Sequence, residues 1–300
     1  MTTGPALVLL AALAGCGRID FTEQSCPSGY VAVAGDAALG TTDFCVMQFE
    51  AKARDIATGT IVDTGCNAAC DPDGLTGVTA ESVPEGRPWR YMNATVARDA
   101  CRALGPAFDL ISNPEWMTIA RDAEGVGANW SGGTPGAGRI VEGRTDGVPA
   151  IIAASADAGR DPYASTSNSA ADAPGSGWEQ RRTVVLSTGG VVWDLAGNAQ
   201  EWIDWRPGGA LDPAPACDGG ELPAVACAGY AYDDFNSRAG TYDTTTGVGL
   251  VIGGNGNAVR RSGQNGDRPP GYAGIYALNM NRDVGDSFPA TGFRCVMRLP

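Results

Sequence analysis

Residues 192–202 read Val-Trp-Asp-Leu-Ala-Gly-Asn-Ala-Gln-Glu-Trp, and residues 292–295, close to the C-terminus, read Gly-Phe-Arg-Cys. In the first stretch two carboxylates, Asp194 and Glu201, lie among large apolar side chains that a core would bury. A Gly-Asn turn between the carboxylates can direct backbone carbonyls inward. The two stretches therefore predict a core element with acidic groups that are either solvated at its edge or act as ligands.

The composition indicates a loop-rich globular protein. Hydrophobic residues make up 43% of the 300 residues, enough for a large core in one or two domains. The 43 glycines, 19 prolines and only 18% charged residues favour short strands and many loops over a helical bundle. A net charge of -13 argues against nucleic-acid binding, because phosphates require a basic surface. We expect residues 26–300 to form one domain.

Residues 1–15 are typical of a lipoprotein signal peptide. The apolar run Ala6–Ala14 is shorter than the roughly 20 residues that span a bilayer, but it fits a signal-peptide core. Leu-Ala-Gly then precedes Cys16, a pattern typical of bacterial processing in which that thiol is acylated. We expect Cys16 to be the lipid anchor and residues 16–25 a tether in the bacterial cell envelope, with Gly17 favouring the outer membrane. The alternative is an ordinary signal peptide and an incidental cysteine.

The remaining cysteines predict disulfides. Setting Cys16 aside leaves eight of the nine cysteines, and an even number in an exported chain favours pairing over zinc binding. The sequence alone leaves the connectivity open. Local spacing suggests that Cys26 and Cys45 staple a hairpin. The other expected local pairs are Cys66 with Cys70 and Cys217 with Cys227.

Two helices and several short strands are predicted. The spacing of apolar residues predicts a helix over 93–104, ended by Gly-Pro. A second helix begins at Ser112, with an early proline and a glutamate in its first turn. Its expected buried stripe is Trp116, Ile119, Ala120 and Ala123. Alternating residues predict strands over 26–33 and 44–50, and over 179–186 and 191–194.

Five segments carry a resemblance to a known family: Phe44–Lys52, Ala97–Cys101, Leu110–Trp116, Asp194–Trp202 and Gly292–Cys295. In this order they resemble the formylglycine-generating enzyme (sulfatase-modifying factor) family. The resemblance implies an α+β, C-type-lectin-like fold in which two helices pack on small antiparallel sheets. It also implies a long-range disulfide between the first helix and the last strand, which is Cys101 with Cys295 here.

The same resemblance implies a structural calcium site. The matching positions bind calcium through the side chains of Asp194 and Glu201 and the carbonyls of Gly197 and Ala199. Hard cations prefer such oxygen ligands. The alternative is that the two carboxylates have no ligand and only flank the core.

The resemblance does not extend to the family's chemistry. Formylglycine formation uses a cysteine pair that holds copper, and no cysteine lies between Val248 and Arg294. The iron-dependent branch requires histidines, and the chain has none. We therefore expect no iron, no copper and no catalysis. An oxidoreductase of the formylglycine-generating type is the alternative.

Residues 253–290 have the composition of a binding surface. Asn, Ser, Gly, Tyr, Asp and Arg alternate there with small apolar residues, as in antibody-like recognition loops. The arrangement resembles the variable proteins of diversity-generating retroelements, whose variable segment precedes a Gly-Phe-Arg ending. We expect Arg260, Arg261 and Arg294 to support this face from beneath. The candidate ligand-binding residues are Gln264, Asn265, Asp267, Arg268, Tyr272, Tyr276, Asn279, Asn281, Arg282, Asp283, Asp286 and Phe288.

The expected partner is a protein, glycan or small molecule outside the cell. A glycine-rich surface loop with ordinary polar faces is the alternative interpretation of the segment. In that case the chain would be a structural envelope lipoprotein.

Overall fold

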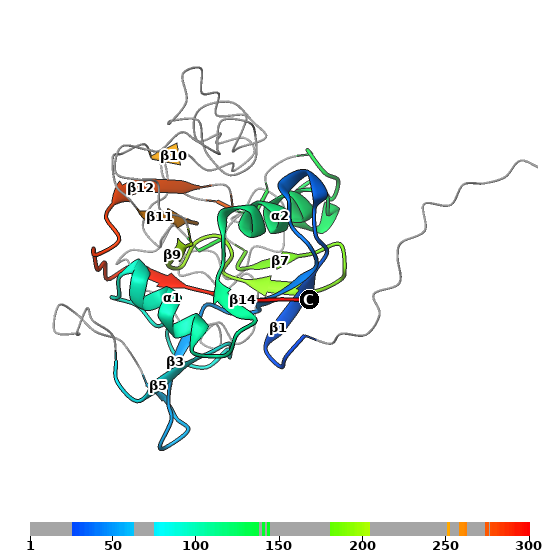
Figure 1. Cartoon of the computed structure of the whole chain (residues 1–300). Coiled ribbons are helices and arrows are strands. Elements are labelled where there is room, and N and C mark those ends of the chain that lie inside the picture. Colours follow the sequence, from blue (N-terminus) through cyan, green and yellow to red (C-terminus); the bar gives the residue numbers. More distant parts are fainter. Residues whose placement is uncertain are drawn as a thin grey trace, which may run out of the picture.

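Over the residues that the structure describes, the protein has an α+β architecture of two α-helices and four small sheets (Figure 1). The computed structural model describes residues 26–62, 75–137, 140–141, 143–144, 181–204, 251–252, 258–262, 274–275 and 277–300. The signal peptide, Cys16 and the tether lie outside the described residues. Within them, neither helix is long and apolar enough to cross a membrane.

A four-stranded antiparallel sheet joins the two ends of the domain. Its order is β1 (Tyr30–Val33), β2 (Phe44–Met47), β14 (Cys295–Arg298) and β6 (Phe108–Leu110). The predicted hairpin of β1 and β2 is confirmed. The C-terminal strand β14 lies between β2 and β6, and its first two residues, Cys295 and Val296, are part of the core.

A five-stranded mixed sheet carries the C-terminal segment. Its order is β10 (Val251–Ile252), β12 (Leu278–Arg282), β11 (Ala258–Arg261), β9 (Gln200–Ile203) and β13 (Thr291–Phe293). Two pairings are parallel, β10 with β12 and β13 with β9, whereas we had expected antiparallel sheets. Parallel pairing needs a long crossover connection. The many residues between β9 and β13 provide one.

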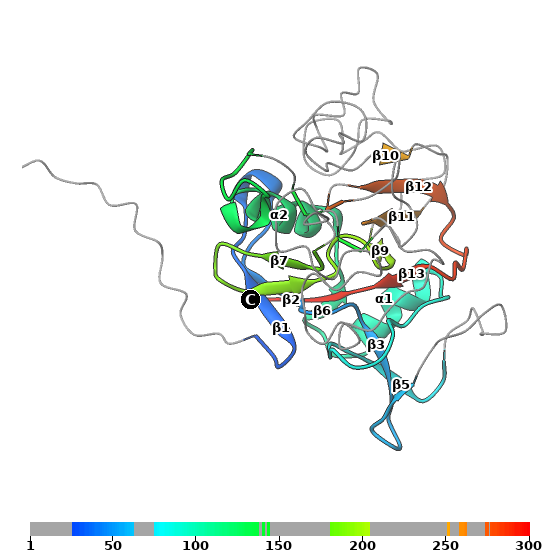
Figure 2. The same cartoon turned by 180° about the vertical axis from the view of Figure 1, so that it is seen from behind.

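Two smaller sheets complete the strands. One contains β4 (Ile61–Val62), β3 (Lys52–Asp55) and β5 (Val78–Glu81). The other is the predicted hairpin of β7 (Thr183–Val185) and β8 (Val191–Trp193). The Trp193 amide donates to the carbonyl of Gln48 at 2.8 Å, which places this hairpin beside the end of β2 (Figure 2).

Both predicted helices are confirmed, and the second begins after the expected capping residue. Helix α1 (Ala94–Arg102) begins after Asn93, whose side chain accepts from the Val96 amide at 2.9 Å. Helix α2 (Asn113–Glu124) begins after Ser112, which forms a reciprocal capping box with Glu115. All four residues of the predicted α2 stripe are buried. Short 3-10 segments, η1 (Ala37–Leu39) and η2 (Gly127–Asn129), contact α2.

Two of the four predicted disulfides are confirmed. Cys26 pairs with Cys45 across the first hairpin, and Cys101 pairs with Cys295, joining α1 to β14 over a sequence separation of 194. The other four cysteines lie outside the described residues, as does Trp205. Trp193, Leu195 and Trp202 are buried, as the sequence predicts.

Candidate functional site

The site is built around the turn 194–201, which connects β8 to β9. Asp194, Gly197 and Asn198 have φ values of 53°, 75° and 60°. Left-handed backbone costs energy in residues other than glycine, so the surroundings must hold this turn in place. Part of that support is the Asn198 amide, which donates to the Arg144 carbonyl at 2.8 Å.

Asp194 forms a buried bidentate ion pair with Arg182. The Arg182 Nε lies 2.7 Å from Oδ1, and the Arg182 Nη2 lies 2.6 Å from Oδ2. Both side chains are at most 1% exposed. The β7–β8 hairpin sets this geometry, because Thr183, the residue after Arg182, pairs with Trp193, the residue before Asp194.

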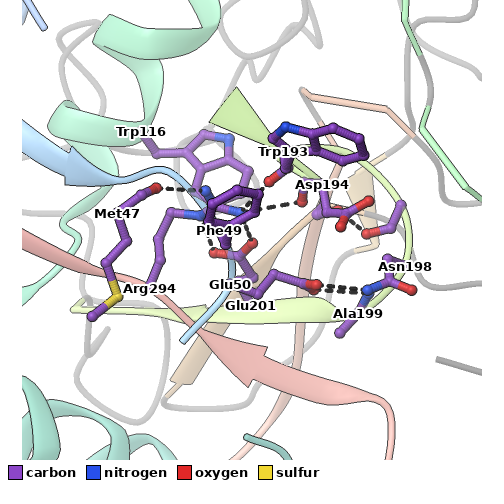
Figure 3. A network of polar contacts seen from close by, with 12 residues as sticks. Met47, Phe49, Glu50, Trp116, Trp193, Asp194, Asn198, Ala199, Glu201 and Arg294 are labelled. Atoms are coloured by element: carbon purple, nitrogen blue, oxygen red, sulfur yellow. Dashed lines mark hydrogen bonds and ion pairs between the residues drawn. The ribbon is translucent and has the colours of Figure 1, made fainter. Parts of the chain in front are cut away.

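Glu201 forms a second buried ion pair, with Arg294. The Arg294 Nε and Nη2 lie 2.7 and 2.5 Å from the two Glu201 oxygens (Figure 3). The same guanidinium donates to the carbonyls of Met47, Trp193 and Asp194 at 3.0, 3.1 and 3.3 Å. Arg294 therefore joins β2, the end of β8 and β9 at one point, and all of its partners are acceptors.

Glu50 lies on the other side of the same turn. Its carboxyl oxygens accept from the Asn198 Nδ2 at 2.6 Å and from the Ala199 amide at 3.1 Å (Figure 3). Burial, followed by repulsion from Asp194, raises the pKa of Glu50 to about 8, against the opposing effect of Lys52. The carboxyl group of Glu50 thus ties the turn to the segment between β2 and β3.

Lys52 is the only lysine among the 21 basic residues of the chain, and its side chain is fully buried. Within the described part of the chain its Nζ has no hydrogen-bond partner. Burial lowers the pKa of Lys52 to about 8, although Glu50 and Asp194 favour its charged form. An arginine at this position would stay charged, because arginine does not lose its proton in proteins.

The side chains predicted to bind calcium do not fit that role in this arrangement. Both oxygens of Asp194 and both of Glu201 already accept from guanidinium groups. The Gly197 carbonyl accepts from Ser262 Oγ at 3.4 Å. Across the described ranges, no three acidic or thiol side chains are placed to hold a metal ion.

Arg260 and Arg261, which we expected to support the predicted binding face, are both buried. Arg261 donates to the Asn113 side chain at the start of α2. The Arg260 guanidinium lies 5.6 Å from the Trp202 ring and 5.2 Å from the Phe288 ring, and it donates to Thr291 Oγ1 at 3.1 Å. Arg260 thus holds the end of the segment against β9.

The structure describes the side chains of four of the twelve candidate ligand-binding residues. Asp283 is exposed and closes a turn with Asp286, whose amide donates to the Asp283 carbonyl at 2.9 Å. Phe288 packs on Arg260. Asn279 is only 5% exposed, which corrects the expectation that it faces outward, because its side of β12 turns toward the core. The rest lie outside the described residues or, in β12, have undescribed side chains: Gln264, Asn265, Asp267, Arg268, Tyr272, Tyr276, Asn281 and Arg282.

Glu50, Lys52 and Arg182 were not among the candidate site residues predicted from the sequence. Two features of the sequence point to Glu50 and Lys52. Glu50 and Lys52 are charged residues at i and i+2 in an otherwise apolar stretch, and Lys52 is the only lysine. A charge that interrupts a buried strand indicates a partner elsewhere in the core.

Comparisons with known proteins leave the family open. No family model matches the chain, and no curated protein matches it. Among solved structures, the "Structure of PvdO from Pseudomonas aeruginosa" is a distant match with 13% sequence identity and a TM-score of 0.37, covering 91% of this chain and 92% of that chain. Similarity at that level carries no argument about fold or function.

Proposed function

We propose that this chain is a cell-envelope lipoprotein with a C-type-lectin-like domain of the formylglycine-generating type. The domain binds an external ligand through residues 253–290 and has no catalytic activity. The observation that carries the proposal is the contrast within that segment. Arg260 and Arg261 are buried in its supporting strand, whereas Asp283 at the end of β12 is exposed. Recognition surfaces combine a rigid supporting backbone with exposed polar side chains that can adapt to a ligand.

The state of Cys295 supports a non-catalytic role. Copper is held by free thiolates. Cys295 is joined to Cys101, and the sequence has no cysteine between Val248 and Arg294. With no histidine in the chain, the remaining family chemistry also lacks its ligands.

A binding assay tests the proposal directly. The mature lipoprotein in detergent is applied to protein and glycan arrays, and saturable binding to a defined ligand is expected. Asp283→Ala should weaken that binding, whereas Asp99→Ala, at an exposed acidic position on α1, should not. Equal effects of the two variants would place the binding surface elsewhere. No saturable ligand would favour a structural envelope protein instead.

The enzymatic alternative has its own experiment. Copper is added to the purified protein together with a cysteine-containing sulfatase peptide, and the peptide mass is followed. We expect no conversion. Formation of formylglycine would overturn the non-catalytic assignment.

Two further measurements address the anchor and the variable segment. Labelling with a fatty-acid analogue should modify the wild-type chain and not Cys16→Ala. The genomic neighbourhood should contain a reverse transcriptase and a near-identical template repeat if the segment is diversified. Their absence would remove the retroelement hypothesis without affecting ligand binding.

A further inference from the structure

Two guanidinium groups bind the two carboxylates to which the family resemblance assigns a calcium ion. The turn 194–201 requires something positive to hold its two carboxylates, because both are fully buried. Arg182 supplies two hydrogen bonds to Asp194, and Arg294 supplies two to Glu201. Bidentate pairs of this kind are the strongest that guanidinium groups form with carboxylates.

The charges of the cluster are already balanced. Its carboxyl groups are Glu50, Asp194 and Glu201, and its basic groups are Lys52, Arg182 and Arg294. With every group ionised, three negative charges face three positive charges, and protonation of Glu50, whose pKa is raised to about 8, leaves the positive charges in excess. A divalent cation added here would leave two uncompensated positive charges in a buried environment, which is strongly unfavourable.

The backbone around the turn is also closely packed. A Cβ atom placed on Gly143 would lie 1.6 Å from the Ala196 carbonyl oxygen, and one placed on Gly197 would lie 2.3 Å from the Arg144 amide. The segments 143–144 and 196–197 are therefore in direct contact. The turn is covered by protein backbone on the side where its glycine lies.

We propose that Arg182 and Arg294, and not a calcium ion, hold this turn, so that the folded domain does not depend on calcium. Arg182 fixes the start of the turn through Asp194. Arg294 fixes its end through Glu201 and also binds the Trp193 and Asp194 carbonyls. The inference concerns only this internal element and is independent of the proposed ligand.

The first experiment uses the wild-type mature protein. It is stripped with EDTA, and its thermal unfolding and calcium binding are measured with and without millimolar calcium. We expect no saturable calcium binding and no change in Tm. A micromolar site would raise the Tm by about 10 °C under these conditions. One bound calcium per chain with such a rise would overturn the proposal.

The second experiment asks whether the guanidinium holds the turn. Arg182→Ala should lower the Tm by about 10 °C, because it leaves Asp194 buried without this partner. Arg181→Ala, at the adjacent half-buried arginine, is the matched control and should lower it by less than about 3 °C. Equal decreases in Tm for Arg182→Ala and Arg181→Ala would overturn the proposal. If Arg182→Ala does not fold, Arg182→Lys tests the same point, since lysine keeps the charge without the fork and a wild-type Tm would contradict the inference.

Discussion

The molecule contains two groups of ion pairs with the same chemistry and opposite surroundings. Arg182–Asp194 and Arg294–Glu201 are fully buried, with closest contacts of 2.6 and 2.5 Å. Arg102–Asp109 and Arg298–Glu115 have closest contacts of 3.0 and 2.7 Å, but their arginines are about half exposed. Water can replace a partner in the second group and not in the first.

The two groups also join different parts of the fold. The buried pairs join the residue before β7 to the turn after β8, and β9 to the residue between β13 and β14. The exposed pairs join the end of α1 to β6, and the start of α2 to the end of β14. Both groups include partners that are close and partners that are distant in the sequence. The difference is that removal of one partner leaves an uncompensated buried charge in the first group, whereas water can solvate the remaining charge in the second.

The largest effect is expected from Arg294→Ala. The substitution leaves Glu201 buried without its guanidinium and also removes donors to the carbonyls of Met47 and Trp193. We expect a loss of about 4 kcal/mol in the free energy of unfolding, measured by urea titration. Arg298→Ala is the exposed control, with a loss of about 1 kcal/mol or less. Similar losses in the free energy of unfolding for Arg294→Ala and Arg298→Ala would show that burial does not distinguish the two groups of ion pairs.

A second effect concerns Lys52, the buried cation without a hydrogen bond. Its folded-state pKa is about 8, below the ordinary 10.5, so the folded protein binds fewer protons there than the unfolded chain between these values. Stability should therefore rise with pH in that window, by at most about 1.4 kcal/mol per pH unit. Lys52→Met should remove this rise in urea titrations across pH.

Two controls sharpen the Lys52 prediction. Lys52→Arg should destabilise the protein at every pH, because arginine stays charged. In protein labelled only at lysine, the single side-chain NMR signal should titrate near pH 8. A signal that titrates near pH 10.5 would show that burial does not lower the pKa of Lys52.

A smaller effect is expected at Arg260, which is buried between two aromatic rings. Arg260→Met should cost about 2 kcal/mol and speed amide hydrogen exchange in residues 283–291, because Phe288 loses its cation–π contact. Arg261→Met, which loses a contact to α2, should not speed amide hydrogen exchange specifically in residues 283–291. Unchanged exchange in Arg260→Met would show that the ring contact does not hold the segment.

The smallest effect is expected at Arg102. Arg102→Ala removes a half-exposed partner of Asp109, while Arg298 remains beside the same carboxylate at 3.3 Å. We expect a loss of less than about 1 kcal/mol that shrinks further in high salt. A large, salt-independent loss would place this pair with the buried group.

Local features of the fold were predictable from the sequence. The capping box at Ser112, the stripe of α2 and the β7–β8 hairpin depend on residues a few positions apart, so short-range patterns identify them. The Cys26–Cys45 pair followed from its hairpin, whereas the Cys101–Cys295 pair followed only from the family resemblance.

The long-range features were not predictable. The predicted hairpin brings Arg182 and Asp194 near each other, but the register that pairs them does not follow from the sequence, nor does the parallel direction of β13 and β9. The burial of Asn279 was missed because a polar residue in an alternating strand was assumed to face solvent. The candidate calcium ligands were recognised as a group, but their actual partners come from two distant segments.

Lys52 is the only residue of the sequence at which lysine-specific enzymes can act, and it is buried. An endoprotease that cuts only after lysine has a single cleavage point in these 300 residues, and that bond lies in β3 within the core. Cleavage must therefore wait until the core opens, and its rate would report the fraction of molecules that have opened. Acetylating or amine-coupling reagents likewise find no accessible lysine on the native domain.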